Sequence, residues 1–370
     1  MSREAIFEAS LAFFLSPIQA FLEDPTVTEV MVNGCDAIYV ERQGRLHRTE
    51  AHFDSEDSLL TAVHNVAQYV GREIDEDRPV LDARLPDGSR VHAVIPPSAR
   101  QGTYLTIRKF SREVFDLDHL VRLGSVSAAA REFLEICVRL HKNLVVAGGT
   151  GTGKTSLLNA LSTAIPPEER IVVIEDSSEL RLQQPHTLYL ESQQADSRGR
   201  GGLSIRDLFR ASLRMRPDRI VVGEVRGGEA LDMIQAMNTG HEGSMTTVHA
   251  NTPRDAIARI ETLVAMGGIE LPLKAMRHQF ASAVDMIIQV NRLQGGPRKI
   301  TSVTEVLNME QETIIMQEIF RYKQLGIDQN GRAFGQFEAT GVRPAVMPRL
   351  EAAGIRLPPN LFAERILLRD

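Results

Sequence analysis

Apolar positions recur at two different spacings along the chain, and each spacing predicts a different kind of element. In residues 4–22 and 54–69 they fall at helical intervals, so each segment would bury one side of a helix. Short apolar or alternating runs between turn residues predict strands. In the first part of the chain, strands are expected at residues 27–32, 37–41, 91–95 and 104–110. This part therefore predicts a mixed α+β unit.

Beyond Ser127 the helical and strand patterns alternate. Helices are expected at residues 127–140, 154–163, 204–215, 227–238, 252–265 and 271–283, with strands at 143–147, 170–174, 219–223, 244–248, 285–291, 299–307 and 312–321. Such alternation predicts an α/β unit with a mostly parallel sheet covered on both faces. The predicted organisation is an N-terminal unit (1–110), a hinge (111–126) and a C-terminal unit (127–370), with no structure predicted for the tail from Gly326.

Local signals mark several boundaries. Pro17 is expected to kink or end the first helix, and Asn33-Gly34 to form the hairpin turn between the first two strands. Asp54 or Ser55 is expected to cap the next helix. The polar loop 193–202 is expected to be mobile.

The segment from Val145 to Ser156 carries the strongest chemical signal. It contains a full match to the phosphate-binding loop G-x-x-x-x-G-K-[ST] between a predicted strand and a predicted helix. Glycines let backbone N–H groups turn toward a phosphate, and the helix N-terminus adds a partial positive charge. The loop therefore predicts binding of ATP or a similar nucleotide by Gly148, Gly149, Thr150, Gly151, Thr152, Gly153, Lys154, Thr155 and Ser156. Lys154 should reach the β- and γ-phosphates, and the Thr155 hydroxyl should bind Mg²⁺.

Carboxylates follow two of the predicted strands. Glu224 follows the strand 219–223, and ligands sit at the carboxyl ends of strands in doubly wound sheets. Glu224 should therefore orient or deprotonate the attacking water, or hold a metal-bound water. Glu175 and Asp176 follow the strand 170–174. Glu175 is expected to face the metal or the water, whereas Asp176 is also a good helix cap.

A histidine ends the strand 244–248. His249 can donate to phosphate oxygens as a γ-phosphate sensor, and a buried core histidine is equally compatible with its position. His241 and His249 lie eight residues apart without nearby cysteines, which is a poor zinc site.

Composition narrows the class of protein. The chain of 370 residues is 43% hydrophobic and 24% charged, which is typical of a globular protein with two domains. No apolar run approaches a membrane span, and no secretion signal is evident. Only Cys35 and Cys137 are present, which favours a reduced, cytoplasmic protein without a structural metal.

Charge argues against a nucleic-acid partner. Residues 1–100 carry nine arginines, no lysine and seventeen acids, so they are acidic. The segment 198–226 holds eight arginines, of which Arg206, Arg210 and Arg214 would form one stripe on a helix. A solvated or subunit-facing stripe is favoured over a nucleic-acid contact.

Four motifs in order resemble the secretion ATPase superfamily, whose members serve type II and type IV secretion and type IV pili. They are the phosphate loop, Glu175-Asp176, Arg216-Pro217-Asp218 leading into Gly223-Glu224-Val225-Arg226, and Thr239-Gly240-His241 through His249-Ala250-Asn251. The form of segments 213–227 and 238–241 is most similar to the tight-adherence (Flp) pilus assembly ATPases. The likeness runs from Asp24 to the tail.

The resemblance implies a RecA-like P-loop ATPase domain behind a smaller, PAS-like α+β domain. It implies that Glu224 is the catalytic glutamate, that Glu175 and Asp176 form an acid pair, and that His249 contacts the active site. Arginines from the N-terminal domain reach the phosphates in this superfamily. The best matches here are Arg90 and Arg108, and Arg226 is a further candidate for a contact across the site.

The resemblance also implies an assembly. ATP and Mg²⁺ would bind in a homo-hexameric ring at the cytoplasmic face of the inner membrane, without nucleic acid. Rotation of one lobe against the other would act on inner-membrane pilus or secretion platform proteins, through which the ring would associate peripherally with the membrane. Two alternatives stay open: a RecA-like nucleic-acid translocase that uses segment 198–226, and a nucleotide-gated scaffold that does not hydrolyse ATP.

Overall fold

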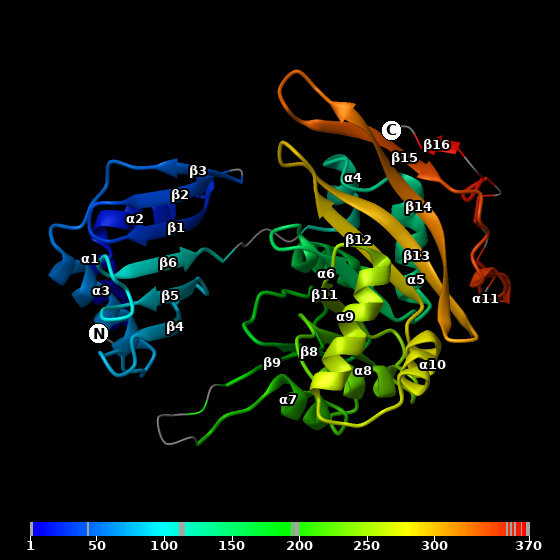
Figure 1. Cartoon of the computed structure of the whole chain (residues 1–370), viewed down its shortest axis with the longest axis horizontal. Helices are drawn as coiled ribbons and strands as arrows, with labels where there is room; N and C mark the ends of the chain where they lie inside the picture. Colours follow the sequence, from blue (N-terminus) through cyan, green and yellow to red (C-terminus); the bar gives the residue numbers. More distant parts are fainter. Residues whose placement is uncertain are drawn as a thin grey trace. The chain divides into compact units, whose positions relative to one another are not determined.

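The computed structural model describes residues 3–42, 44–110, 115–193, 195, 200–352, 354–355, 357–358, 360–363 and 365–367. The chain divides into two compact units, residues 1–113 and 114–370 (Figure 1). Every helix in the described part is too short or too polar to span a bilayer.

The N-terminal unit is a six-stranded antiparallel sheet whose buried face packs against helices. The helices are α1 (Arg3–Phe14), α2 (Ser16–Glu23) and α3 (Glu56–Tyr69), and the strands are β1 (Val27–Asn33), β2 (Ile38–Arg42), β3 (Arg45–Arg48), β4 (Val80–Arg84), β5 (Arg90–Val94) and β6 (Tyr104–Arg108). The strand order is β3-β2-β1-β6-β5-β4. Alternate strand residues are buried with helix residues in one apolar core, as expected for a sheet with one solvated face.

Local signals set the ends of these elements. Ser55 caps α3 in a reciprocal capping box with Ser58. Pro17 lies in the first turn of α2, which confirms the predicted break. Gly34 has a φ of 79°, but the turn to β2 runs on to Ala37, whose carbonyl accepts the Asn33 N–H at 2.8 Å. The hairpin is confirmed, whereas the two-residue turn is wrong.

The C-terminal unit is built on one large mixed sheet. Its helices are α4 (Leu117–Arg122), α5 (Ala128–Arg139), α6 (Lys154–Ser162), α7 (Ile205–Ser212), α8 (Glu229–Met237), α9 (Pro253–Met266), α10 (Leu273–Ala283) and α11 (Met347–Ala352). Its strands are β7 (Leu144–Gly148), β8 (Ile171–Glu175), β9 (Thr187–Glu191), β10 (Arg219–Val222), β11 (Met245–His249), β12 (Met286–Arg292), β13 (Arg298–Glu310), β14 (Thr313–Ile327), β15 (Ala333–Ala339) and β16 (Arg365–Leu367).

The strand order is β16-β15-β14-β13-β12-β7-β11-β10-β8-β9. The six strands from β12 to β9 are parallel, and those from β12 to β16 are antiparallel. Leu144 and Val146 of β7 join the apolar core with α4, α5 and α6, whereas Val145 and Ala147 join the core with α7 to α10. Helices thus cover both faces, which confirms the predicted α/β fold class (Figure 1).

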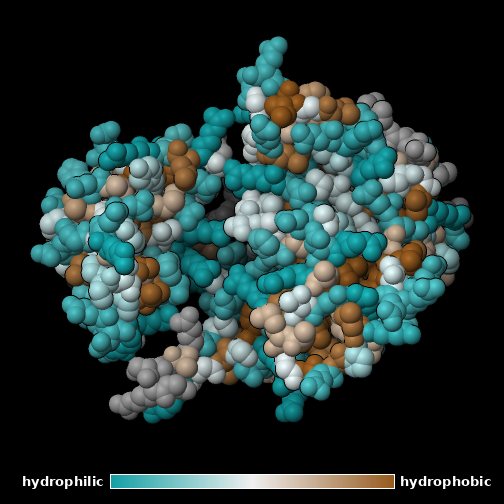
Figure 2. All heavy atoms as spheres, viewed as in Figure 1, coloured by the Kyte–Doolittle hydropathy of each residue, from teal (hydrophilic) through white to brown (hydrophobic). Residues whose placement is uncertain are grey.

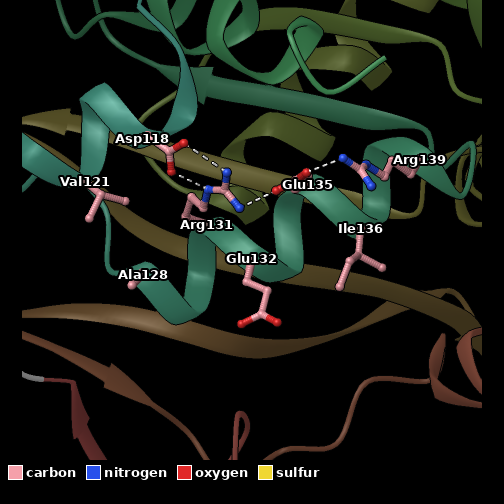
Figure 3. Close-up of a pocket in the computed structure, with 8 residues that line it drawn as sticks. All are labelled: Asp118, Val121, Ala128, Arg131, Glu132, Glu135, Ile136 and Arg139. Carbon is pink, nitrogen blue, oxygen red and sulfur yellow. Dashed lines mark hydrogen bonds and ion pairs between the residues drawn. The ribbon is translucent and has the colours of Figure 1, made fainter. Parts of the chain in front are cut away.

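Part of the predicted hinge belongs to the C-terminal unit. Asp116 caps α4, and Leu117 and Leu120 are buried in the core of this unit. In the shallow groove drawn in Figure 3, Arg131 of α5 pairs with Asp118 of α4 at 2.9 Å. Residues 115–126 are therefore held on the C-terminal unit, and residues 111–114 of the hinge lie outside the described residues.

The predicted arginine stripe is shorter than expected. Helix α7 ends at Ser212, so Arg214 lies beyond it. Arg206 and Arg210 pair with Asp232 of α8 at 2.6 and 3.0 Å. Of the loop 193–202, residues 194 and 196–199 lie outside the described residues, and its end Gln193 pairs with Leu203 in an isolated bridge.

The tail beyond Gly326, which the sequence left without a prediction, continues the sheet. It contributes the end of β14, then β15, α11 and β16. The end of the β14–β15 hairpin carries Leu325, Ile327 and Phe334, each about half exposed. Apolar side chains are visible on this part of the surface in Figure 2.

Candidate nucleotide-binding and catalytic site

The carboxyl ends of four parallel strands meet at one edge of the large sheet. β7 ends at Gly148, β8 at Glu175 and β11 at His249, and β10 ends two residues before Glu224. The register pairs His249 directly with Gly148, and β10 is a parallel neighbour of β8. This edge therefore brings together the phosphate loop, the predicted carboxylates and His249.

The phosphate loop has a backbone shape that favours glycine. Gly151 and Gly153 have φ values of 70° and 98°, in the left-handed region. A Cβ on Gly148 would lie 2.5 Å from Thr152 Oγ1 and 2.6 Å from the Val290 carbonyl oxygen. The loop then opens directly into α6 at Lys154, so its N–H groups and the helix N-terminus share one concavity.

Lys154 and Glu224 face one another across this concavity. Lys154 Nζ donates to the Gly149 carbonyl at 3.1 Å and lies 3.8 Å from Glu224 Oε1. Asp218 lies at the opposite end of β10, where its carboxylate accepts the Arg170 N–H at 2.7 Å. Glu224 is thus the carboxylate of this strand that can act on a phosphate held by Lys154.

Arg226 links two acids at this edge. Its guanidinium contacts Glu224 Oε2 at 2.6 Å and Asp176 Oδ2 at 3.2 Å. Asp176 also accepts the Ser192 hydroxyl at 2.7 Å. Residues 176–186 contain no helix, so the helix-cap alternative for Asp176 is wrong.

Glu175 lies beneath the surface of the site. The residue is 4% exposed, and its Oε1 accepts the N–H groups of Glu179 and Leu180 at 2.9 and 3.0 Å. Burial raises the pKa of this carboxyl from 4.5 to about 7, although the two hydrogen bonds oppose the rise. A Cβ on Gly223 would lie 2.8 Å from Glu175 Cγ, so the glycine before Glu224 leaves room for this side chain.

The raised pKa of Glu175 predicts a pH-dependent stability. Between its ordinary pKa of 4.5 and about 7, the folded protein retains a proton that the unfolded chain loses. Raising the pH through this window therefore lowers the free energy of unfolding, by roughly 3 kcal/mol at most. Glu175→Gln removes this titration. In urea unfolding with EDTA and without nucleotide, we expect the variant to gain stability relative to wild type from pH 4.5 to 7, and no further above.

The exposed acid Glu168 provides the control for this measurement. Glu168→Gln should show no such drift relative to wild type. A difference between Glu175→Gln and wild type that stays constant across the window would contradict the raised pKa.

The remaining predicted residues occupy three places. His249 is exposed beside the phosphate loop, so the buried-core alternative for it is wrong. His241 lies at the other end of β11, away from this edge. Arg90 and Arg108 lie in the N-terminal unit, directly opposite one another on β5 and β6, and Arg108 is exposed. Leu105 and Ile107 beside it are fully buried, as their alternation predicts.

Two further side chains contact the phosphate loop. Thr155 Oγ1 donates to Glu179 Oε2 at 3.4 Å, and Arg298 Nε donates to the Gly151 carbonyl at 3.0 Å. Glu179 follows the Glu175-Asp176 pair closely. Its position in the same acidic segment after β8 could have indicated that it lies near the phosphate loop. Arg298 comes from the distant β12–β13 hairpin, and no local pattern indicates its contact.

Known proteins are similar to most of the chain. The family model for type II/IV secretion system proteins matches residues 14–330. A Mycobacterium tuberculosis protein named for conjugal transfer is 38% identical over 299 residues, covering 79% of this chain and 84% of the relative. The type IV secretion system protein PtlH of Bordetella pertussis is 36% identical over 324 residues, covering 80% and 95%. The pilus retraction motor PilT with bound ADP has a TM-score of 0.56 at 20% identity, over 79% of this chain and 81% of that chain.

The fold and the phosphate loop define a RecA-like P-loop ATPase. The chain belongs to the type II/IV secretion system protein family, because the family model and both sequence relatives cover most of its length. It is therefore a secretion ATPase, and the resemblance read from its motifs is confirmed at the level of the superfamily. Closeness to the tight-adherence branch stays a prediction.

Proposed function

We propose that this protein hydrolyses ATP to drive the assembly of a tight-adherence (Flp) type pilus or a related secretion machine. An extended form of the proposal includes retraction of the pilus. The observation that carries the proposal is the 3.8 Å approach of Lys154 Nζ to Glu224 Oε1. It puts a phosphate-binding cation and a candidate base at one point. A loop that only bound nucleotide would not need that carboxylate.

Hydrolysis follows from this arrangement. The phosphate-loop N–H groups and Lys154 hold the β- and γ-phosphate oxygens. Glu224 takes the proton of a water whose oxygen bonds to the γ-phosphorus, while the bond to the β–γ bridging oxygen breaks and ADP leaves. His249 donates to a γ-phosphate oxygen. Glu175 supports the segment that carries Glu179, and Asp176 holds Arg226 beside the nucleotide.

The side chains around Thr155 fit Mg²⁺. The Thr155 hydroxyl lies 3.4 Å from Glu179 Oε2, and the Glu224 carboxylate lies at the same sheet edge. Oxygen donors of this kind suit a hard divalent cation. Thr155, with Glu224 acting through water, would hold a Mg²⁺ that offsets negative charge on the phosphates.

The N-terminal unit would supply further positive charge. Arg90 and Arg108 face each other across β5 and β6, so their side chains project from the same face of the sheet. We propose that residues 1–110 act as a PAS-like domain that moves relative to the C-terminal unit. Its motion would bring these arginines to the γ-phosphate, as an arginine finger does.

The proposed assembly is a homo-hexameric ring at the cytoplasmic face of the inner membrane, held there by pilus or secretion platform proteins. Nucleic acid is not a proposed partner, and the pairing of Arg206 and Arg210 with Asp232 supports this. These pairs neutralise part of the basic stripe that a nucleic-acid backbone would need.

Mass measurement combined with phosphate release tests the proposal. We expect a mass of six copies with a non-hydrolysable ATP analogue, and phosphate release with ATP and Mg²⁺. A stable monomer both with and without the analogue would contradict the ring. Absence of phosphate release would indicate the non-hydrolytic scaffold. Turnover stimulated by DNA with a steep salt dependence would instead support a translocase.

A further inference from the structure

The segment that carries Glu224 is fixed by hydrogen bonds from two sources. The N–H of Gly223 donates to the Ile174 carbonyl at 2.9 Å, and that of Val225 donates to the Thr247 carbonyl at 3.0 Å. These contacts tie the first half of the segment to β8 and β11. Beyond Val225 the chain leaves the sheet, and neighbouring strands no longer hold it.

A single carboxylate holds the second half. Glu229 Oε1 accepts the N–H of Arg226 at 2.7 Å and the N–H of Gly227 at 2.8 Å. Glu229 is the first residue of α8, and only 6% of it is exposed. A buried carboxylate is costly unless it is hydrogen-bonded, and both these bonds and the helix N-terminus stabilise it. Its burial is therefore explained by the turn that it holds.

The turn packs closely around this carboxylate. A Cβ on Gly227 would lie 3.0 Å from Glu229 Oε2, and a Cβ on Gly228 would lie 2.6 Å from Gly267 Cα. The close contacts leave the turn little room to move while Glu229 is in place. Removing the Glu229 carboxylate would leave two N–H donors without an acceptor and would open space beneath them.

We propose that Glu229 is a positioning residue for ATP hydrolysis, which holds the 226–227 turn so that Glu224 and Arg226 keep their places. The guanidinium of Arg226 reaches both Glu224 and Asp176 from this turn. Shifting the backbone of Arg226 would move that guanidinium and with it the carboxylate of Glu224. This inference rests on the catalytic role proposed for Glu224.

The test compares turnover with nucleotide binding in the full chain. Glu229→Ala should lower kcat by at least about tenfold, because small displacements of catalytic groups cost large factors in rate. The dissociation constant of a non-hydrolysable ATP analogue should change less than about twofold, since β7, the phosphate loop and α6 are not altered. Glu229→Gln keeps an oxygen acceptor for both N–H groups and should recover most of the lost kcat.

The same helix offers a matched control. Asp232 lies one turn further along α8, is largely buried, and pairs with Arg206 and Arg210 instead of the turn. Asp232→Asn should leave kcat within about twofold of wild type. If Asp232→Asn lowered kcat as far as Glu229→Ala does, destabilisation of α8 would explain both losses of kcat. That result would overturn the positioning role.

A double-mutant cycle separates the positioning role from general damage. If Glu229 acts through Arg226, then Glu229→Ala should cost much less in an Arg226→Ala background than in wild type. Equal costs in both backgrounds, or unchanged kcat in Glu229→Ala, would overturn the inference. The Glu224→Gln variant distinguishes failure of the proposed function from failure of this inference. Normal turnover in Glu224→Gln would contradict the catalytic role of Glu224. Lost turnover in Glu224→Gln together with normal turnover in Glu229→Ala would contradict only the positioning role of Glu229.

Discussion

Replacing Lys154 with alanine should abolish ATP hydrolysis and strongly weaken nucleotide binding. The Lys154 ammonium lies within the phosphate loop, 3.1 Å from the Gly149 carbonyl, and only 12% of its side chain is exposed. Alanine would remove the ammonium group that we propose contacts the β- and γ-phosphates. We expect turnover to fall by on the order of a hundredfold or more, as when a preorganised donor to a developing charge is lost. Phosphate release and equilibrium binding of a labelled ATP analogue measure the two effects.

Lys274 provides the control for this variant. It is an exposed lysine of α10, and Lys274→Ala should leave both quantities within about twofold of wild type. Thermal unfolding without nucleotide should show that Lys154→Ala is folded. A folded Lys154→Ala protein that binds and hydrolyses ATP normally would exclude the loop as the nucleotide site, and with it the proposed motor function.

The elements around the phosphate loop could be predicted because local and long-range preferences agree there. β7 is an unbroken apolar run buried on both faces, Gly151 and Gly153 stand where φ is positive, and α6 begins at Lys154. A strand in the middle of a parallel sheet needs apolar residues on both sides, so the sequence alone reveals it. The same reasoning locates β8, β10 and β11, and therefore the edge where Glu224 lies.

Elements that depend on distant partners escaped prediction. β4 and β9 lack an unbroken apolar run like that of β7, and their burial is decided by the strands beside them rather than by their own pattern. Helix α4 is a six-residue element whose burial comes from packing of Leu117 and Leu120 on the C-terminal core. Local spacing over so few residues does not distinguish a hinge from a docked helix.

The candidate site residues also differ in whether local sequence or tertiary contacts determine their position. The placement of Glu224 at this edge could be predicted from its position after an apolar strand, and the separation of His241 from His249 follows from the length of β11 between them. The role proposed for Glu229 could not be predicted from sequence, because acidic residues are generally favourable in the first turn of any helix. Its contacts with Arg226 and Gly227 depend on how the turn folds back, which residue type and spacing do not encode.

Replacing Glu224 with glutamine should separate binding from hydrolysis. Glutamine has nearly the same shape and still can accept a hydrogen bond from Arg226, but it cannot take a proton from water. We therefore expect ATP affinity within a few-fold of wild type and kcat lower by on the order of a hundredfold or more. Binding of ATP to the variant and single-turnover phosphate release measure the two steps independently.

Asp218 provides the control for this variant, because it is an acid at the other end of the same strand. It precedes β10 as Glu224 follows it, so the two acids lie at opposite edges of the same sheet. Asp218→Asn should keep kcat within about twofold, because its carboxylate accepts a backbone N–H from Arg170 at the far end of the strand, which the asparagine side-chain oxygen can also accept. If Asp218→Asn lost turnover while Glu224→Gln retained it, the base would have to act from the edge without a phosphate loop. That outcome would contradict the site geometry, since a general base must lie within hydrogen-bond reach of the water it activates.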